Sequence, residues 1–184
     1  ERIERFFKED IRDLTKIFDF GSLSLLTDLL PEKVSSILSI NSLSRDIEVN
    51  FRTAARWLDI FEEFYYCFRL PSYQTKRIAS VKKEKKLYLW DWSSVEDKGA
   101  RLENIVASHL LKFCDYLHDH DGWRTELFFL RDSTGREVDF LVCLNRNPWF
   151  AIETKGVDKN PSKNLFYFKE KLNIPYCYQL INLP

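Results

Sequence analysis

The sequence predicts a mixed α+β fold made of two parts in series. Residues 42–70 give a short helix, a three-residue turn, a longer helix and then β-rich sequence, the order of a winged helix-turn-helix. Residues 99–182 give a helix, three strands, a second helix and a last strand. The chain of 184 residues is 45% hydrophobic with only 5 Gly and 6 Pro, so it can bury a core and is neither disordered nor fibrous.

The first segment is an amphipathic helix. Residues 1–18 repeat apolar side chains at helical spacing, with charges on the other face. Gly21 is expected to interrupt it, Ser22 to cap the next helix and Pro31 to break that one. The chain opens within this pattern, so we expect residues 1–20 to link to an upstream domain.

The winged helix-turn-helix is expected over residues 21–92. Its helices are predicted at 42–47 and 51–64, and its strands at 65–70 and 87–92. The polar, acidic stretch that follows marks the boundary with the second domain.

That second domain is expected over residues 93–184. Its first helix, 99–118, is predicted to bury Leu102, Ile105, Val106, Leu110, Phe113 and Leu117. The strands are predicted at 125–131, 136–144, 149–155 and 175–182, with the second helix at 161–172.

Charge excludes a protein that is basic all over, because 28 Lys and Arg balance 28 Asp and Glu. A local basic run nevertheless lies at residues 72–86. It has two interpretations: a wing that contacts phosphate, or a flexible solvated loop. Groove contacts would come from the start of the second helix, and protein packing is the equal alternative for this module. The nucleic-acid candidates are Asn50, Arg52, Thr53, Arg56, Lys82, Lys83, Lys85 and Lys86.

Cysteine spacing and hydropathy point to the cytoplasm. The four cysteines lie far apart among apolar neighbours, without a CxxC pair, which favours buried thiols over disulfides or zinc. No apolar run reaches membrane-spanning length, so no membrane association is expected.

Two acidic residues in the predicted hairpin are the main candidates for a metal-binding site. If Asp139 lies opposite Glu153, the two carboxylates repel and need a cation between them. Lys155, one step along the same face, supplies one charge, and Mg²⁺ or Mn²⁺ would supply the rest. Glu103 adds a third carboxylate if its helix packs over this face. Such a set suits metal-assisted phosphodiester hydrolysis. The alternative is a surface ion-pair ladder.

Asp139, followed after thirteen residues by Glu153-Thr154-Lys155, resembles the PD-(D/E)XK nuclease signature. The α-β-β-β-α-β order is that of this restriction-endonuclease-like fold, and Glu103 matches the glutamate of its first helix. Val138 stands where the motif name has proline. The resemblance implies catalytic roles for Glu103, Asp139, Glu153 and Lys155, with the three carboxylates as metal ligands.

More closely, residues 21–179 resemble the C-terminal region of predicted prokaryotic AAA+-type ATPases, in which a winged helix precedes a nuclease-like domain. That family's ATP-binding domain would lie upstream, since no GxxxxGK[ST] motif occurs in this sequence. Such a domain could make the parent protein oligomeric. The matching runs are Leu38–Leu43, Phe68–Tyr73, Lys85–Trp92, Gly99–Lys112, Phe128–Val142 and Ile152–Gly156.

Two functions follow. The first is a metal-dependent DNA endonuclease domain of an ATPase. The second is an inactive nuclease-fold module that binds nucleic acid or the upstream ATPase domain and regulates it.

Overall fold

The computed structural model describes residues 20–74, 84–157 and 160–182. The helix expected over residues 1–18, together with Lys82 and Lys83, lies outside the described residues. The described elements are α3 (Phe20–Leu29), η2 (Leu30–Lys33), α4 (Ile40–Asp46), α5 (Phe51–Glu63), β1 (Cys67–Pro71), β2 (Lys85–Leu89), η4 (Trp92–Ser94), α6 (Lys98–Asp121), β3 (Thr125–Arg131), β4 (Glu137–Leu144), β5 (Asn147–Lys155), α7 (Lys163–Leu172) and β6 (Tyr176–Ile181).

In the part of the first half that the structure describes, helices α3, α4 and α5 accompany a two-stranded antiparallel sheet, β1–β2. The predicted helix, tight turn and helix are confirmed as α4 and α5. Asn50 caps α5, because its Oδ1 accepts a hydrogen bond from the Thr53 amide at 2.9 Å. Glu48 adopts φ 55° in the turn, which lets the chain reverse within three residues.

The expected N-cap at Ser22 is wrong, whereas the expected break at Gly21 stays a prediction, because the helix before it lies outside the described residues. Helix α3 runs through both Gly21 and Ser22, so Ser22 is not an N-cap. Leu23 and Leu26 on this helix are almost fully buried. Their burial outweighs the cost of about 1 kcal/mol that a glycine imposes inside a helix.

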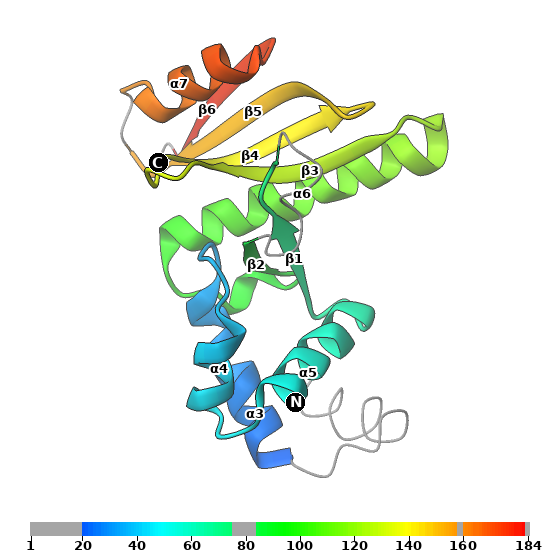
Figure 1. The fold of residues 1–184 in the computed structure, drawn as a ribbon, viewed down its shortest axis with the longest axis vertical. Coiled ribbons are helices and arrows are strands. Elements are labelled where there is room, and N and C mark those ends of the chain that lie inside the picture. The colour runs from blue at the N-terminus through cyan, green and yellow to red at the C-terminus, as the bar shows by residue number, and fades with distance from the viewer. Residues whose placement is uncertain (1–19, 75–83, 158–159, 183–184) are drawn as a thin grey trace.

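The second half is a four-stranded sheet between two helices. The strand order is β3-β4-β5-β6, with antiparallel neighbours except for the parallel pair β5–β6. Helix α7 forms the crossover between that parallel pair, as Figure 1 shows. Helices α6 and α7 cover opposite faces of the sheet.

For helix α6, the prediction of which residues are buried is partly wrong. Of the expected stripe, Leu117 is buried, but Phe113 is 38% exposed. The buried face is instead formed mainly by small or polar side chains, because α6 is packed closely on both sides. Those residues are Asn104, Ala107, Ser108 and Cys114.

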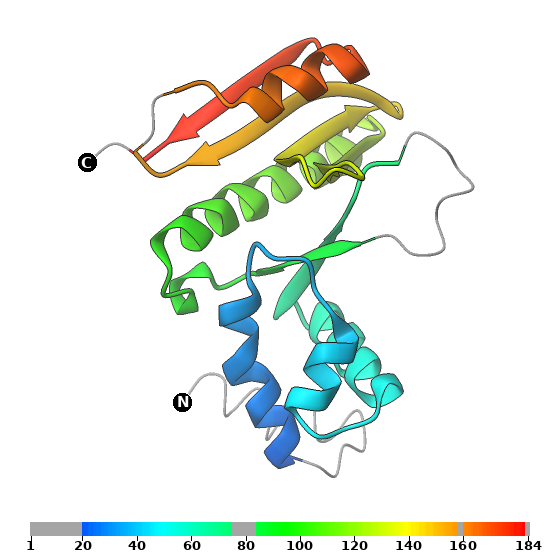
Figure 2. The same cartoon turned by 60° about the vertical axis from the view of Figure 1, so that its left-hand side comes forward.

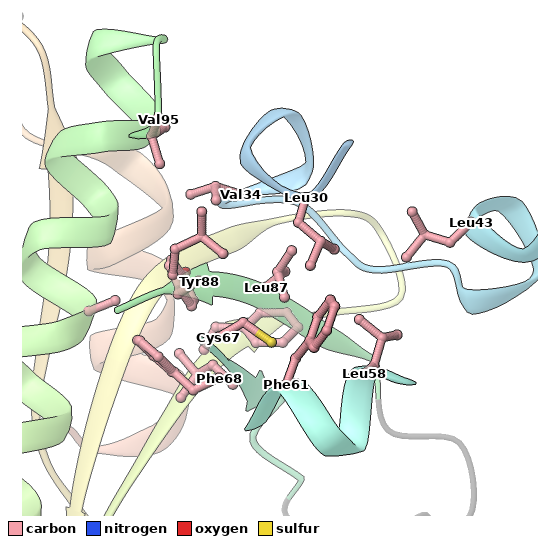
Figure 3. Packing of buried hydrophobic residues seen from close by; sticks show 14 of the residues in the cluster. Leu30, Val34, Leu43, Leu58, Phe61, Cys67, Phe68, Leu87, Tyr88 and Val95 are labelled. Atoms are coloured by element: carbon pink, nitrogen blue, oxygen red, sulfur yellow. The ribbon is translucent and has the colours of Figure 1, made fainter. Parts of the chain in front are cut away.

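Helix α6 joins the two halves, since it lies between the four-stranded sheet and the β1–β2 hairpin (Figures 1 and 2). One hydrophobic cluster therefore runs from α3 to β5. Figure 3 shows the part around the hairpin, where Phe61 of α5, Cys67 of β1 and Leu87 of β2 converge. The two halves share a core and cannot separate without exposing it to water.

All four cysteines are free thiols, three of them buried. Within the described ranges, no helix combines the length and the apolar character that crossing a bilayer requires.

Candidate functional site

Asp139 and Glu153 come together across the β4–β5 hairpin. The register pairs Phe140 with Ile152, and the next step along both strands brings Asp139 beside Glu153. Thr154 fixes the Asp139 carboxylate, because its backbone N–H and its hydroxyl both donate to Oδ2, at 2.8 and 2.7 Å. The hairpin thus holds one carboxylate in a defined orientation next to another.

Glu153 is a buried carboxylate, only 5% exposed. Its Oε1 lies 2.9 Å from the Lys155 ammonium, and the Ser162 hydroxyl donates to it at 3.5 Å. Its Oε2 is buried and has no hydrogen-bond partner among the described residues. Burial, and then the charge of Asp139, raise the pKa of Glu153, with a partial offset from Lys155.

Ser162 brings the start of α7 to this site. Its hydroxyl caps the helix by accepting a hydrogen bond from the Leu165 amide at 3.3 Å. The Ser162 amide donates to the Gln179 side chain at 2.8 Å, which ties the loop before α7 to β6. Residues of β6 and of the start of α7 therefore surround Glu153 of β5.

A second cluster centres on Lys86 of β2. The side chain of Lys86 is 2% exposed, and its Nζ lies 2.7 Å from Glu137, 3.1 Å from Glu103 and 3.7 Å from Asp139. These charges together raise its pKa, although burial, the largest single effect, acts in the opposite direction. Lys86 therefore stays an ammonium ion surrounded by carboxylates from α6 and β4.

Glu103 is held from one side by two donors of β2. The Tyr88 hydroxyl donates to its Oε1 at 2.7 Å, and the Lys86 ammonium contacts the same oxygen. Burial, with the charge of Asp139, raises the pKa of Glu103 to about 7 despite these donors. Asp139 is thus electrostatically close to both Glu103 and Glu153, and it connects the two clusters.

The expected set of three metal ligands is not formed in this conformation. The described residues contain no group of three or more His, Cys, Asp or Glu side chains placed to hold one metal ion. The physical reason is that Lys86 contacts Glu103 and Asp139 at once and takes the place of a cation between them. The pair Asp139 and Glu153, with Lys155, remains as predicted from the hairpin.

Lys86 also corrects the expected nucleic-acid set, because a buried, ion-paired ammonium does not reach a phosphate. Its neighbour Lys85 is exposed. The sequence shows only that Lys86 and Tyr88, two residues apart in a strand, share a face, and it does not show that this face is buried. Sequence reasoning also missed Glu137, whose second oxygen binds Arg131 at 2.7 Å.

The candidates on α5 lie apart from the carboxylates. Arg52 and Arg56 are exposed, Thr53 is half-buried, and Asn50 serves as the cap. Farther along α5, Asp59 and Glu62 bind the mostly buried Arg69 guanidinium, each at 2.5 Å. Arg69 of β1 therefore neutralises part of the negative charge at the end of α5, whereas Arg52 and Arg56 near its beginning face solvent.

These features define a two-part α+β protein whose carboxylate cluster is built across the junction of the parts. A family model described as a domain of unknown function, DUF8612, matches residues 1–95, and this chain belongs to that family. A second, DUF4143, also described as a domain of unknown function, matches residues 98–181. No curated protein and no solved structure matches the chain.

Proposed function

We propose that the second half is a PD-(D/E)XK-type nuclease domain that hydrolyses phosphodiester bonds of nucleic acid with the help of Mg²⁺ or Mn²⁺. The helix, three antiparallel strands, crossover helix and parallel strand support this proposal, since that is the α-β-β-β-α-β order. So does the placement of Asp139, Glu153 and Lys155 around one hairpin.

The observation that carries the proposal is the buried Oε2 of Glu153, without a hydrogen-bond partner in the described part of the chain. An unpartnered buried carboxylate oxygen is costly, and the cost rises when a second carboxylate lies beside it. A divalent cation held by Glu153 and Asp139 would remove this cost. Mg²⁺ is commonly bound by one or two carboxylates with waters and substrate phosphate completing its shell.

In the proposed reaction, each residue of the site has a separate role. Asp139 and Glu153 would hold the metal, and Thr154 orients Asp139 through its two hydrogen bonds. The metal, when bound, supplies an activated water and charge stabilisation at phosphorus. The Lys155 ammonium is placed to position that water or to neutralise developing negative charge.

The first half is proposed to be a winged helix-turn-helix. Helices α3, α4 and α5 followed by the β1–β2 hairpin support it, as do the bridges from Val34 and Ile37 to β2. DUF4143 is often found in AAA-ATPase-associated contexts, which supports the proposal that the parent protein couples this region to an ATPase.

Calorimetric titration of Mg²⁺ and Mn²⁺ tests the nuclease proposal. Wild type is expected to bind, and Glu153→Gln to bind more than about tenfold more weakly, since loss of even an outer-shell partner has that effect at metal sites. Glu170→Gln, an exposed carboxylate on α7, is the control and should bind like wild type. Plasmid nicking with Mn²⁺ should follow the same ranking. Absence of both metal binding and nicking in wild type would contradict the proposal.

The second candidate is an inactive nuclease-fold module that binds nucleic acid or the ATPase domain. The contacts of Lys86 favour it, because an internal ammonium already neutralises part of the carboxylate cluster. Salt-dependent binding to duplex DNA that is unaffected by EDTA and by Glu153→Gln would support this candidate over the enzyme.

A further inference from the structure

Lys86 is an unusual residue for the place it occupies. It belongs to β2 in the first half of the chain, yet its ammonium is buried among carboxylates of the second half. Burial of a lysine is rare unless the charge is paired, and here three carboxylates and the ring of Phe129, 5.6 Å away, surround it. Its position follows from the β1–β2 hairpin packing against α6 and against β3 of the four-stranded sheet.

The contact with Asp139 is the longest of the three, at 3.7 Å against 2.7 Å for Glu137 and 3.1 Å for Glu103. Lys86 therefore keeps two closer partners if Asp139 binds something else. A divalent cation on Asp139 would lie within a few ångströms of the ammonium, and two cations at that distance repel in a buried site.

We infer that Lys86 is the internal counter-ion of this site and that it competes with a divalent metal for the Asp139 carboxylate. This inference rests on the proposed metal site at Asp139 and Glu153. The β1–β2 hairpin thereby lowers the metal affinity of the nuclease-like half, because it places the Lys86 ammonium beside Asp139. Lys86 lies in the stretch matched by DUF8612, and the carboxylates lie in the stretch matched by DUF4143.

The test is Lys86→Met, which keeps the length of the side chain and removes its charge. The variant should bind Mg²⁺ and Mn²⁺ about tenfold or more tightly than wild type in calorimetry, since repulsion between a divalent ion and a nearby ammonium is of that order even when water screens it. Saturating metal should also raise its melting temperature more than that of wild type. Lys85→Met, on the exposed side of the same strand, is the control and should leave both readouts unchanged.

Three results separate the inference from the proposed function. Wild type and Lys86→Met binding metal equally would overturn the inference and leave the nuclease proposal standing. Metal binding by wild type that is lost in a folded Lys86→Met would overturn it as well, because Lys86 would then support the site. No metal binding in either protein would overturn both.

Lys86→Met removes the ammonium that three carboxylates share, with only Glu137 keeping a second cationic partner, Arg131, within the described residues, and the variant can fail to fold. The double variant Lys86→Met/Glu137→Gln removes one of these charges and leaves Asp139 and Glu153 intact. The same tightening of metal binding is expected from it, measured against Glu137→Gln alone.

Discussion

At the scale of single residues, two carboxylates of this site, Glu103 and Glu153, are held in environments that oppose their charge and raise their pKa. Burial and the charge of Asp139 raise the pKa of Glu103 from 4.5 to about 7. The folded protein therefore binds a proton at Glu103 more tightly than the unfolded chain does. The stabilisation that follows is fully present below pH 4.5 and is lost as the pH rises through about 7.

Glu103→Gln is expected to remove this pH dependence. Relative to the variant, wild type should lose about 3 kcal/mol of unfolding free energy between pH 4.5 and pH 7, since one pKa unit corresponds to about 1.4 kcal/mol. Urea denaturation at several pH values measures the difference. Glu63→Gln, an exposed carboxylate on α5, should run parallel to wild type. A constant gap between wild type and Glu103→Gln across this range would show that the pKa of Glu103 is the same in the folded and unfolded states.

At the scale of elements, the local signals placed the helices and strands well. Helix α4, the tight turn and helix α5, the β4–β5 hairpin and helix α7 were all predicted, because caps, turn residues and apolar periodicity act over a few residues. Asn145 and Arg146 form the hairpin turn with φ 51° and 68°, which fits two strands joined by a two-residue loop. The errors arose where packing decided: Ser22 lies inside α3 and does not cap it, and α6 buries Asn104 and Ser108.

The exposed start of α5 leads to a prediction about nucleic acid. If this helix contacts the backbone of duplex DNA, Arg52→Ala/Arg56→Ala should weaken binding and reduce the slope of log K against log salt by about 2, since each lost phosphate contact contributes about 0.9. Fluorescence anisotropy at several salt concentrations measures both. The control Lys112→Ala/Lys169→Ala removes two exposed charges from α6 and α7. An equal effect from both double variants would mean that α5 is not the contact surface.

At the scale of the whole molecule, α6 makes one unit of the two halves. Asn104 is completely buried on this helix, and its amide pairs with the backbone of Leu89: Oδ1 accepts from the N–H at 2.8 Å, and Nδ2 donates to the carbonyl at 2.6 Å. The side chain thus extends the hydrogen bonding of β2 into α6. Because Glu103 is its neighbour in the sequence, the same contact holds Glu103 of α6 close to Lys86 of β2.

Asn104→Ala should therefore destabilise the whole protein and not one half. We expect a loss of about 2–5 kcal/mol, because a buried N–H and a buried carbonyl would each lose their partner at about 1–3 kcal/mol. Urea unfolding followed by circular dichroism and by tryptophan fluorescence measures it. Asn147→Ala, whose exposed amide makes a single local hydrogen bond, should cost less than about 1 kcal/mol. A loss confined to one of the two signals would indicate that the halves unfold separately.

The sequence by itself determined the order of elements, the α+β class and the pairing of Asp139 with Glu153 and Lys155. These depend on local propensity and on the two-residue period of a hairpin, both of which can be read along the chain. Only the tertiary structure decided where Lys86 lies. In the sequence it is one lysine of a basic run, but in the structure it is buried among Glu103, Glu137 and Asp139. Its place depends on how the β1–β2 hairpin packs on α6, and such long-range packing leaves little trace in the local pattern of residues.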